Sequence, residues 1–248
     1  MQFYLGTHRP NWLELLDVPL FVSHRTLSPR KRMPVARCDW ALDSGGFSEL
    51  SMYGEWRTTL PEYVEAVDRY QQIGGLEWAA PQDWMCEPFI LEKTGLSVRE
   101  HQERTVQNYL DLRDRGPFVP VLQGWAISDY IACCDLYDEA GVDLTTAERV
   151  GIGSVCRRQG TSEIGTLIKV LHDAGISCHG FGVKTEGLLL AGRYLKSADS
   201  MAWSFTARRD WPLPGCSHKS CANCSRYALK WRRQLLAHRD QLELEVAA

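Results

Sequence analysis

The sequence predicts an α/β fold, a (β/α)₈ TIM barrel that carries a short cysteine-rich segment and a helix at its C-terminal end. The chain has 248 residues, which is the usual size of one such barrel. Short apolar runs alternate along it with amphipathic stretches, as expected for parallel strands joined by helices. Hydrophobic residues make up 44% of the chain and charged residues 24%, which is typical of a globular protein with a large core.

Eight short apolar runs are predicted to form the strands. They are residues 3–5, 20–22, 40–42, 76–79, 118–122, 149–152, 178–183 and 197–201. Amphipathic stretches between them predict helices at 60–73, 97–115, 128–140, 161–174 and 185–195. Ser97 and Glu100 have the spacing of a capping box, and Ser128 is a candidate N-cap. Gly141 and Gly175 stand where helices are expected to end.

One compositional break divides the chain. Residues 210–215 contain Pro212 and Pro214 and separate the barrel-like part from a cysteine-rich tail and a last predicted helix at 227–244. We therefore expect residues 1–210 to form the catalytic barrel and residues 211–248 to pack on it, so that the whole chain is one domain.

Composition excludes several classes of protein. The net charge of −3 argues against a general polyanion binder. No apolar run reaches the roughly 18 residues that a membrane-spanning helix needs, and the first residues lack the pattern of a signal peptide. The chain has nine cysteines, an odd number, so we expect free thiols in a reducing cytoplasm rather than a disulfide framework.

Basic residues nevertheless occur in local pairs. For any one pair, solvated surface charge is the simpler interpretation. A nucleic-acid enzyme needs only one positive face, so the pairs remain candidates for phosphate contacts. The candidates are Arg157, Arg158, Arg208 and Arg209.

Polar residues and glycines follow the predicted strands at their carboxyl ends, where a barrel places its chemistry. They are Asp43, Asp83, Gln123, the glycine-rich stretches 151–154 and 181–182, and Asp199. A single Asp in such a place is more often a helix N-cap, and a single Phe is more often core. Together the set is typical of a purine pocket, in which Asp and Gln pair with the edge of guanine while Phe47 and Phe181 stack on its faces.

Five motifs in order carry a family resemblance. They are DSGGF at 43–47, VLQG at 121–124, GIGSV at 151–155, HGFGV at 179–183, and Asp199 followed by a loop with arginines. This set resembles the tRNA-guanine transglycosylase superfamily over roughly residues 39–238. The compact chain, with DSGGFSEL, PQDWMCEP and GIGSVCRR, is most similar to the phage and bacterial transglycosylases that insert 7-deazaguanine derivatives into DNA, the DpdA family.

The resemblance implies a role for each matching residue. Asp199 would attack C1′ of the target nucleoside and hold the sugar as a covalent ester. Asp43 would protonate the leaving guanine and deprotonate the incoming base. The two roles suit carboxylates because the transition state resembles an oxocarbenium ion. The residues expected to bind the base are Ser44, Phe47, Asp83, Gln123, Gly151, Gly153, Ser154, Phe181 and Gly182.

The three cysteines near the C-terminus have the composition of a structural zinc site. Cys216, Cys221 and Cys224 end in a C-x-x-C pair, and clustered exposed thiols without a metal would oxidise in a cytoplasmic protein. The family's pattern, C-x-C-x-x-C with a distant His, is not matched in full. His238 on the last helix is the favoured fourth ligand, with His218 as the alternative. Such a zinc does no chemistry, so no catalytic cofactor is expected.

The expected substrates are DNA and a free 7-deazaguanine such as 7-cyano-7-deazaguanine, with tRNA as the alternative polymer. The tRNA enzymes typically carry more elements after the barrel, which favours DNA for this compact chain. A non-catalytic zinc-stabilised barrel that binds nucleic acid is a second class of function, and a barrel glycosidase is a third. Retention of both Asp43 and Asp199 argues against the second, since two buried carboxylates are costly without a use. The oligomeric state is left open, with a homodimer as one option.

Overall fold

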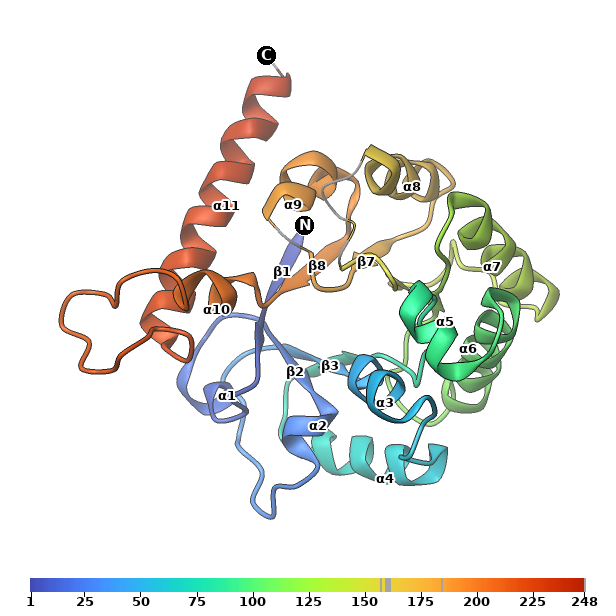
Figure 1. The fold of residues 1–248 in the computed structure, drawn as a ribbon, viewed down its shortest axis with the longest axis horizontal. Helices are drawn as coiled ribbons and strands as arrows, with labels where there is room; N and C mark the ends of the chain where they lie inside the picture. Colours follow the sequence, from blue (N-terminus) through green and yellow to red (C-terminus); the bar gives the residue numbers. More distant parts are fainter. Residues whose placement is uncertain (157, 159–161, 184, 248) are drawn as a thin grey trace.

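Eight parallel strands form one curled sheet in the computed structural model, which describes residues 1–156, 158, 162–183 and 185–247 (Figure 1). The strand order is β4-β3-β2-β1-β8-β7-β6-β5, so the first and last strands of the chain are neighbours. The strands are β1 (Gln2–Thr7), β2 (Leu20–Ser23), β3 (Trp40–Asp43), β4 (Leu76–Ala79), β5 (Val121–Leu122), β6 (Val150–Ile152), β7 (Cys178–Gly180) and β8 (Ser197–Ser200).

The closed TIM barrel expected from the sequence is not formed, because the edge strands β4 and β5 are not paired with each other. In the described part of the chain, an isolated parallel bridge between Ala79 and Phe118 joins the two edges. The Ala79 N–H donates to the Pro117 carbonyl over 2.9 Å, and the Val119 N–H donates to the Ala79 carbonyl over 3.2 Å. Pro117 and Pro120 have no N–H to continue this pairing, and β5 has only two residues. The predicted strand 118–122 is therefore mostly irregular.

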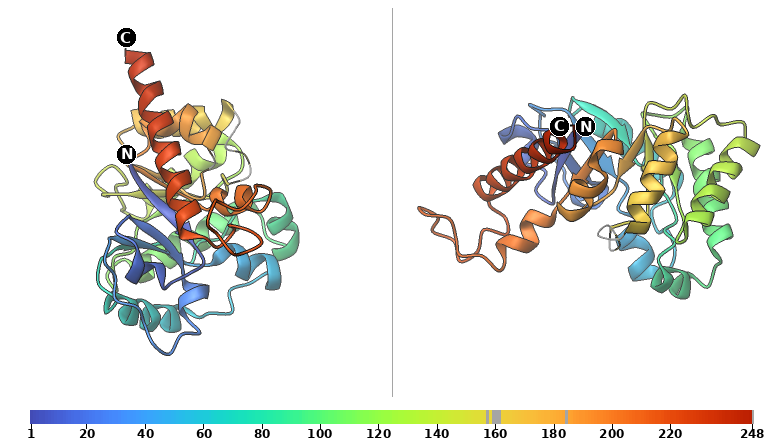
Figure 2. Two further views of the ribbon diagram at one scale, coloured as in Figure 1. Left: turned by 90° about the vertical axis from the view of Figure 1, so that its left-hand side faces the viewer. Right: turned by 90° about the horizontal axis from the view of Figure 1, so that it is seen from above.

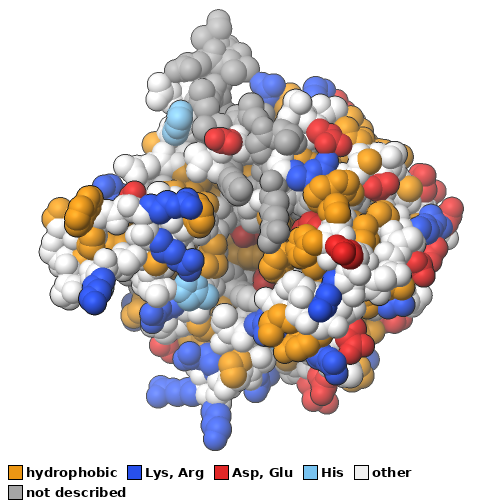
Figure 3. Space-filling view, in the orientation of Figure 1, with side chains coloured by type: hydrophobic (Ala, Val, Ile, Leu, Met, Phe, Trp, Pro, Cys, Tyr) orange, Lys and Arg blue, Asp and Glu red, His pale blue; other side chains and the backbone are white. Residues whose placement is uncertain are grey.

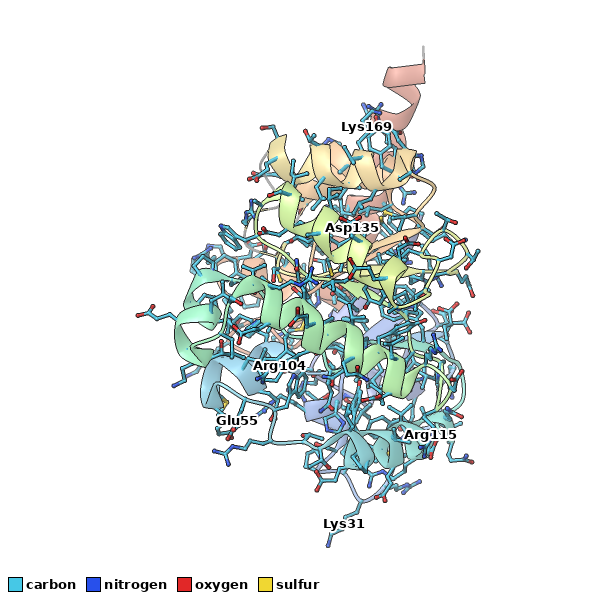
Figure 4. The ribbon with its side chains drawn as sticks, turned by 90° about the vertical axis from the view of Figure 1, so that its right-hand side faces the viewer. Lys31, Glu55, Arg104, Arg115, Asp135 and Lys169 are labelled. Atoms are coloured by element: carbon cyan, nitrogen blue, oxygen red, sulfur yellow. The ribbon has the colours of Figure 1, made fainter. Side chains whose placement is uncertain are left out.

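Helices surround the curled sheet (Figure 1). They are α1 (Trp12–Leu15), α2 (His24–Leu27), α3 (Gly46–Tyr53), α4 (Leu60–Gln71), α5 (Pro88–Thr94), α6 (Val98–Leu112), α7 (Ile127–Glu139), α8 (Ser162–Asp173), α9 (Thr185–Ala191) with the 3₁₀ turn Gly192–Tyr194, α10 (Ala202–Ala207) and α11 (Ser225–Ala247). Charged side chains such as Arg104, Asp135 and Lys169 project from α6, α7 and α8 on the side away from the sheet (Figure 4). No described helix is long and apolar enough to span a membrane.

Local sequence signals set the starts of the longer helices. At α6, the Ser97 hydroxyl accepts from the Glu100 N–H over 3.2 Å, and the Glu100 carboxylate accepts from the Ser97 N–H over 2.8 Å, as the capping box predicts. Ser128 is not the N-cap of α7. That helix begins one residue earlier, after Ala126, and the Asp129 carboxylate accepts from the Ala126 N–H over 2.8 Å. The capping side chain is therefore that of Asp129, in the first turn of the helix itself.

Aromatic side chains fill the inside of the curled sheet. Tyr4, Phe21 and Trp78 are buried there with the His179 ring, whose centroid is 4.6 Å from that of Trp78. Burying a side chain of this size contributes about 1.5–3 kcal/mol, so this cluster supports the floor below the strand ends. Two larger apolar clusters lie between the sheet and the surrounding helices, one on each half of the sheet.

The C-terminal segment packs against one side of the sheet unit. Cys221 and Tyr227 lie in the same apolar cluster as Trp12 of α1 and Trp203 of α10. The helix α11 also contacts α9, and its last turns extend beyond the rest of the molecule (Figure 2). The metal-ligand candidates in the loop before α11 are therefore anchored on both sides by buried residues.

Candidate active site

A cavity of about 800 Å³ lies at the carboxyl ends of the strands. It opens on the face seen in Figure 3, between the lobe of α10 with its following loop and the helices α3 and α5. The ends of β1 and β2 and the segments after β3, β4, β6, β7 and β8 all contribute to its lining. Both Asp43 and Asp199 line it, so the fold brings together two carboxylates that are 156 residues apart in the chain.

The turn after β3 explains the spacing of the first motif. Asp43 is the last residue of β3, and Gly45 has a φ of 84°, which favours glycine. A Cβ at Gly45 would lie 2.7 Å from Cγ of Arg25, and one at Gly46 would lie 2.9 Å from the Trp56 ring. The two glycines let the chain turn directly from the strand into α3, so the Asp43 carboxylate stays at the cavity floor.

Burial raises the pKa of Asp43 above its ordinary value. The nearby charge of Asp199 raises it further, while hydrogen bonds from the Ser23 hydroxyl and the Gly45 N–H favour the ionised form. A raised pKa makes the Asp43 carboxyl group a better proton acceptor than an ordinary carboxylate, which suits a residue that must take up a proton and give it back.

Asp199 points into the cavity from β8 and is 5% exposed. Its Oδ1 accepts from the Gly182 N–H over 2.8 Å and lies 3.4 Å from His179 Nε2. Burial raises the pKa of Asp199 to about 7, and the Gly182 N–H opposes that shift. The Gly182 hydrogen bond fixes the carboxylate beside the end of β7, and Asp199 lines the cavity.

His179 connects Asp199 to a second residue of β8. Its Nδ1 is 2.9 Å from the Ser197 hydroxyl, and burial lowers the pKa of His179, with the charge of Arg149 as a smaller cause. The ring is therefore neutral. If the Ser197 hydroxyl donates to Nδ1, the proton is on Nε2, facing Asp199.

A hydrogen-bonded network surrounds the third carboxylate. Asp83 accepts from the Ser44 hydroxyl over 3.2 Å and from the Gln123 amide. Burial raises the pKa of Asp83 to about 7, and the charge of Asp43 adds to the shift. The Ser154 hydroxyl lies 2.8 Å from the Gln123 amide oxygen and 2.9 Å from a Glu87 carboxylate oxygen. Because a carboxylate has about four acceptor positions, Asp83 keeps capacity for a ligand.

Seven of the nine residues expected to bind the base line the cavity; Gln123 and Gly151 do not. The seven are Ser44, Phe47, Asp83, Gly153, Ser154, Phe181 and Gly182. Gln123 is fully buried behind Asp83, so it orients that carboxylate. A Cβ at Gly151 would lie 2.5 Å from the Phe181 ring, and one at Gly153 would lie 2.2 Å from the Gln123 amide. The absence of side chains at these glycines makes room for Phe181 and Gln123, while Gly153 itself also lines the cavity.

The four arginines expected at the phosphates differ in their surroundings, and none of the described ones lines the cavity. Arg157 lies outside the described residues. Arg158 is committed to other groups, with its guanidinium 4.2 Å from the Trp125 ring centroid and paired with Glu163. Arg208 and Arg209 are exposed beside the cavity, at the end of α10.

Several lining residues were not predicted from the sequence. Phe21 comes from β2, Cys156 from the loop after β6, and Met201 and Phe205 from the segment after Asp199. The run ADSMAWSFTARR offers a signal for the last two, because a short helix after a strand end turns one face to the site.

The cysteine-rich loop brings four possible metal ligands together. Ligand atoms of Cys216, His218, Cys221 and Cys224 all lie within 4.8 Å of one another. His218 Nε2 is 3.2 Å from Cys221 Sγ, which also accepts from the Leu213 N–H over 3.3 Å. A tetrahedral zinc with bonds of about 2.0–2.3 Å needs such a compact Cys₃His set, so these residues could hold a metal ion such as zinc.

The expected fourth ligand His238 is corrected to His218. His238 is exposed on α11, thirteen residues after its first residue, Ser225, or about 20 Å along the axis at the rise of an α-helix. The helix begins immediately after Cys224 and carries His238 away from the loop, whereas His218 lies within the loop itself.

Asp43 and Asp199 line one cavity together with a hydrogen-bonding network and aromatic rings. Two such carboxylates can support displacement at a sugar carbon, with one group as nucleophile and the other as proton donor. No curated protein matches the chain. The family model described as DpdA, DeoxyPurine in DNA protein A, matches residues 1–247. Since this match spans nearly the whole chain, the protein belongs to the DpdA family.

Proposed function

We propose that this protein exchanges guanine in DNA for a free 7-deazaguanine base through a covalent bond between Asp199 and the sugar. The observation that carries the proposal is the pair Asp43 and Asp199, both with raised pKa values and both lining one cavity. Membership of a family described by deoxypurines in DNA supports a transglycosylase that acts on DNA.

In the first half of the reaction, a carboxylate oxygen of Asp199 attacks C1′ of a deoxyguanosine. The C1′–N9 bond breaks, and protonated Asp43 gives its proton to the leaving guanine. The sugar is then held as an ester of Asp199. In the second half, the Asp43 carboxylate takes a proton from the incoming base, whose nitrogen attacks C1′ and releases Asp199. The exchange consumes no electrons, and the two carboxylates supply both proton transfers.

Base selection follows from the network around Asp83. Its carboxylate, held by Ser44 and Gln123, can accept from the N1–H and amino groups shared by guanine and 7-deazaguanines. Phe47 and Phe181, which also line the cavity, would stack on the base. Ser154 and the backbone at Gly153 and Gly182 would complete the contact surface.

A zinc ion in the Cys216, His218, Cys221 and Cys224 cluster would have a structural role. A closed site of four protein ligands leaves no position for a substrate, and these residues do not line the cavity. The metal would fix the loop between α10 and α11, and so the position of α10 beside Asp199.

We expect labelled base to enter DNA rather than tRNA when the two compete. The assay mixes a guanine-containing DNA with a transcribed tRNA of the queuosine type and offers labelled guanine or 7-cyano-7-deazaguanine. Incorporation should fall steeply with salt, because phosphate contacts release counterions. Incorporation into the tRNA alone would overturn the DNA assignment and favour the alternative substrate.

The exchange rate is expected to fall as the pH drops below about 7. Only ionised Asp199 is a nucleophile, and its pKa is raised to about 7, so acidification protonates it. Each further pH unit should lower the single-turnover rate about tenfold. A rate that stays constant between about pH 5 and 7 would contradict the assignment of a carboxyl group with this raised pKa as the nucleophile.

A further inference from the structure

We propose that Phe205 is a stacking surface for the DNA base next to the exchanged guanine. This inference rests on the proposed function and adds to it a binding position for a second nucleobase, outside the floor of the cavity. It also implies that the target strand is bound unpaired at the site, with the flanking base taken out of the duplex stack.

The surroundings of the Phe205 ring point to this role. Phe205 is 55% exposed, although it is a large apolar residue, and it lines the cavity. The Arg209 guanidinium carbon lies 3.7 Å from the centroid of the ring, but Arg209 does not line the cavity. The guanidinium therefore lies over one face of the ring and outside the set of residues that line the cavity. One face of the ring is supported by a cation, which fixes its orientation, and the side toward the cavity is open to a planar group.

The cavity itself has a buried floor and an exposed mouth. Asp83 and Asp199 at the floor are less than a tenth exposed, whereas Phe47 and Phe205 at the mouth are 41% and 55% exposed. Phe47 also contacts another aromatic ring, that of Phe89, at a ring separation of 6.0 Å. The exchanged base would bind at the floor, beside the reacting carboxylates of Asp43 and Asp199. A volume of about 800 Å³ leaves room at the mouth for a second planar group.

The charge of the lobe that carries Phe205 favours a nucleic acid strand as the occupant. Residues 202–220, which include α10 and the loop that follows it, contain three basic residues, Arg208, Arg209 and Lys219, and one acidic residue, Asp210. The rest of the chain contains 25 basic and 30 acidic residues, so this lobe is positive in a chain that is negative overall. Lys and Arg side chains are visible on the lobe of α10 and its following loop, toward the cavity (Figure 3). An exposed aromatic ring within a basic segment matches the chemistry of unpaired DNA, which offers bases and phosphates together.

The stacking contact would offset part of the cost of exposing the target. When a guanine leaves the stack, its neighbour loses a stacking partner, and the Phe205 ring would replace it. Stacking of one base on an aromatic side chain changes affinity by roughly tenfold to a hundredfold. Arg209, on the other face of the ring, remains exposed and can meet the phosphate of the same strand.

The test is a double-mutant cycle between Phe205 and the flanking bases. Radiolabelled guanine is exchanged into single-stranded DNA with one target guanine, flanked by normal bases or by an abasic position on the 5′ or the 3′ side. For the unmodified protein, one of the two abasic substrates should lower kcat/KM about tenfold or more. Phe205→Ala should show that loss already on normal DNA and no further loss on the abasic substrate, while Phe205→Trp should behave as the unmodified protein does.

Tyr53→Ala is the matched control, because Tyr53 is also exposed and carries a guanidinium, that of Arg57 at 5.4 Å, but does not line the cavity. It should leave kcat/KM unchanged on every substrate. Two outcomes would overturn the stacking role while leaving the proposed function intact. In the first, the loss of kcat/KM caused by Phe205→Ala multiplies with the loss caused by each of the two abasic positions. In the second, Tyr53→Ala lowers kcat/KM as much as Phe205→Ala does. If the unmodified protein exchanges guanine into no DNA at all, the proposed function fails and the inference fails with it.

Discussion

Replacing Asp199 with alanine is expected to abolish base exchange, lowering the rate by about 10⁴-fold or more, the scale of losing a catalytic nucleophile. The reason is geometric as well as chemical. Asp199 lines the cavity and accepts a hydrogen bond from the Gly182 N–H at 2.8 Å, and the His179 ring lies 3.4 Å away. No covalent adduct between protein and DNA should then appear on a denaturing gel. The measurement is single-turnover incorporation of labelled guanine, with adduct formation scored in parallel.

The asparagine variant separates loss of chemistry from loss of fold. The pKa of Asp199 is raised from 3.8 to about 7, so the folded protein favours the protonated carboxyl group. The resulting stability is present in full below about pH 4 and is lost as the pH rises through about 7. Above that pH the fold carries a buried charge, and Asp199→Asn removes it. We expect this variant to be inactive yet more stable at pH 8, by up to about 4 kcal/mol in the free energy of unfolding.

Asp135→Ala provides the control, since Asp135 is an exposed carboxylate on α7, away from the cavity (Figure 4). It should keep full exchange activity and unchanged stability. A covalent adduct trapped by Asp199→Ala would show that another group is the nucleophile. A destabilised Asp199→Asn would instead show that the carboxylate is favoured, not opposed, by its surroundings.

The sequence predicted the strands better than it predicted how they join. All eight predicted runs overlap observed strands, because apolar runs of this length are buried on both faces of a parallel sheet. Closure of the sheet could not be predicted. It depends on whether the backbone of residues 117–120 can pair with Ala79, and two prolines in that stretch limit the pairing to a single bridge. Short helices such as α3 and α5 were missed because fewer than nine residues show no clear period.

The sequence predicted which carboxylates lie at the candidate site, because their positions at strand ends place them there. It predicted less well the residues whose role depends on side chains from other elements. Asp43, Asp83 and Asp199 meet at one cavity as expected from their positions. The arrangement around Gln123 was not predicted, since sequence spacing does not show that this side chain lies behind Asp83. Arg158 belongs to a basic pair in the sequence, but its guanidinium packs on the Trp125 ring and pairs with Glu163. Such partners come from other elements and become visible only in the folded chain.

Removal of one ligand from the cysteine-rich loop is expected to destabilise the C-terminal part of the protein. A structural zinc in peptides contributes about 10–16 kcal/mol of apparent binding free energy, comparable to the entire stability of a domain. Between its buried ends the loop depends on the metal, because residues 214–219 lack regular structure and most of them are exposed. Cys224→Ser should therefore lose the metal, lower the melting temperature and open the loop to proteases. Metal analysis should give about one zinc per chain for the unmodified protein, as four ligands imply.

The choice between the two histidines is the sharpest form of this prediction. His218→Ala should lower zinc content and expose the loop to proteolysis, because His218 Nε2 lies 3.2 Å from Cys221 Sγ. His238→Ala should change neither, since His238 is exposed on α11. Cys134→Ala, at a half-buried cysteine of α7, controls for the loss of any thiol. If His218→Ala kept its zinc and His238→Ala lost it, His238 would be the fourth ligand. An unmodified protein that folds without zinc would contradict the metal site altogether.

Loss of zinc should also affect DNA binding, because the loop joins α10 to α11. We expect Phe205 to be displaced and DNA binding to weaken, while the carboxylates of Asp43 and Asp199, held by β3 and β8, stay in place.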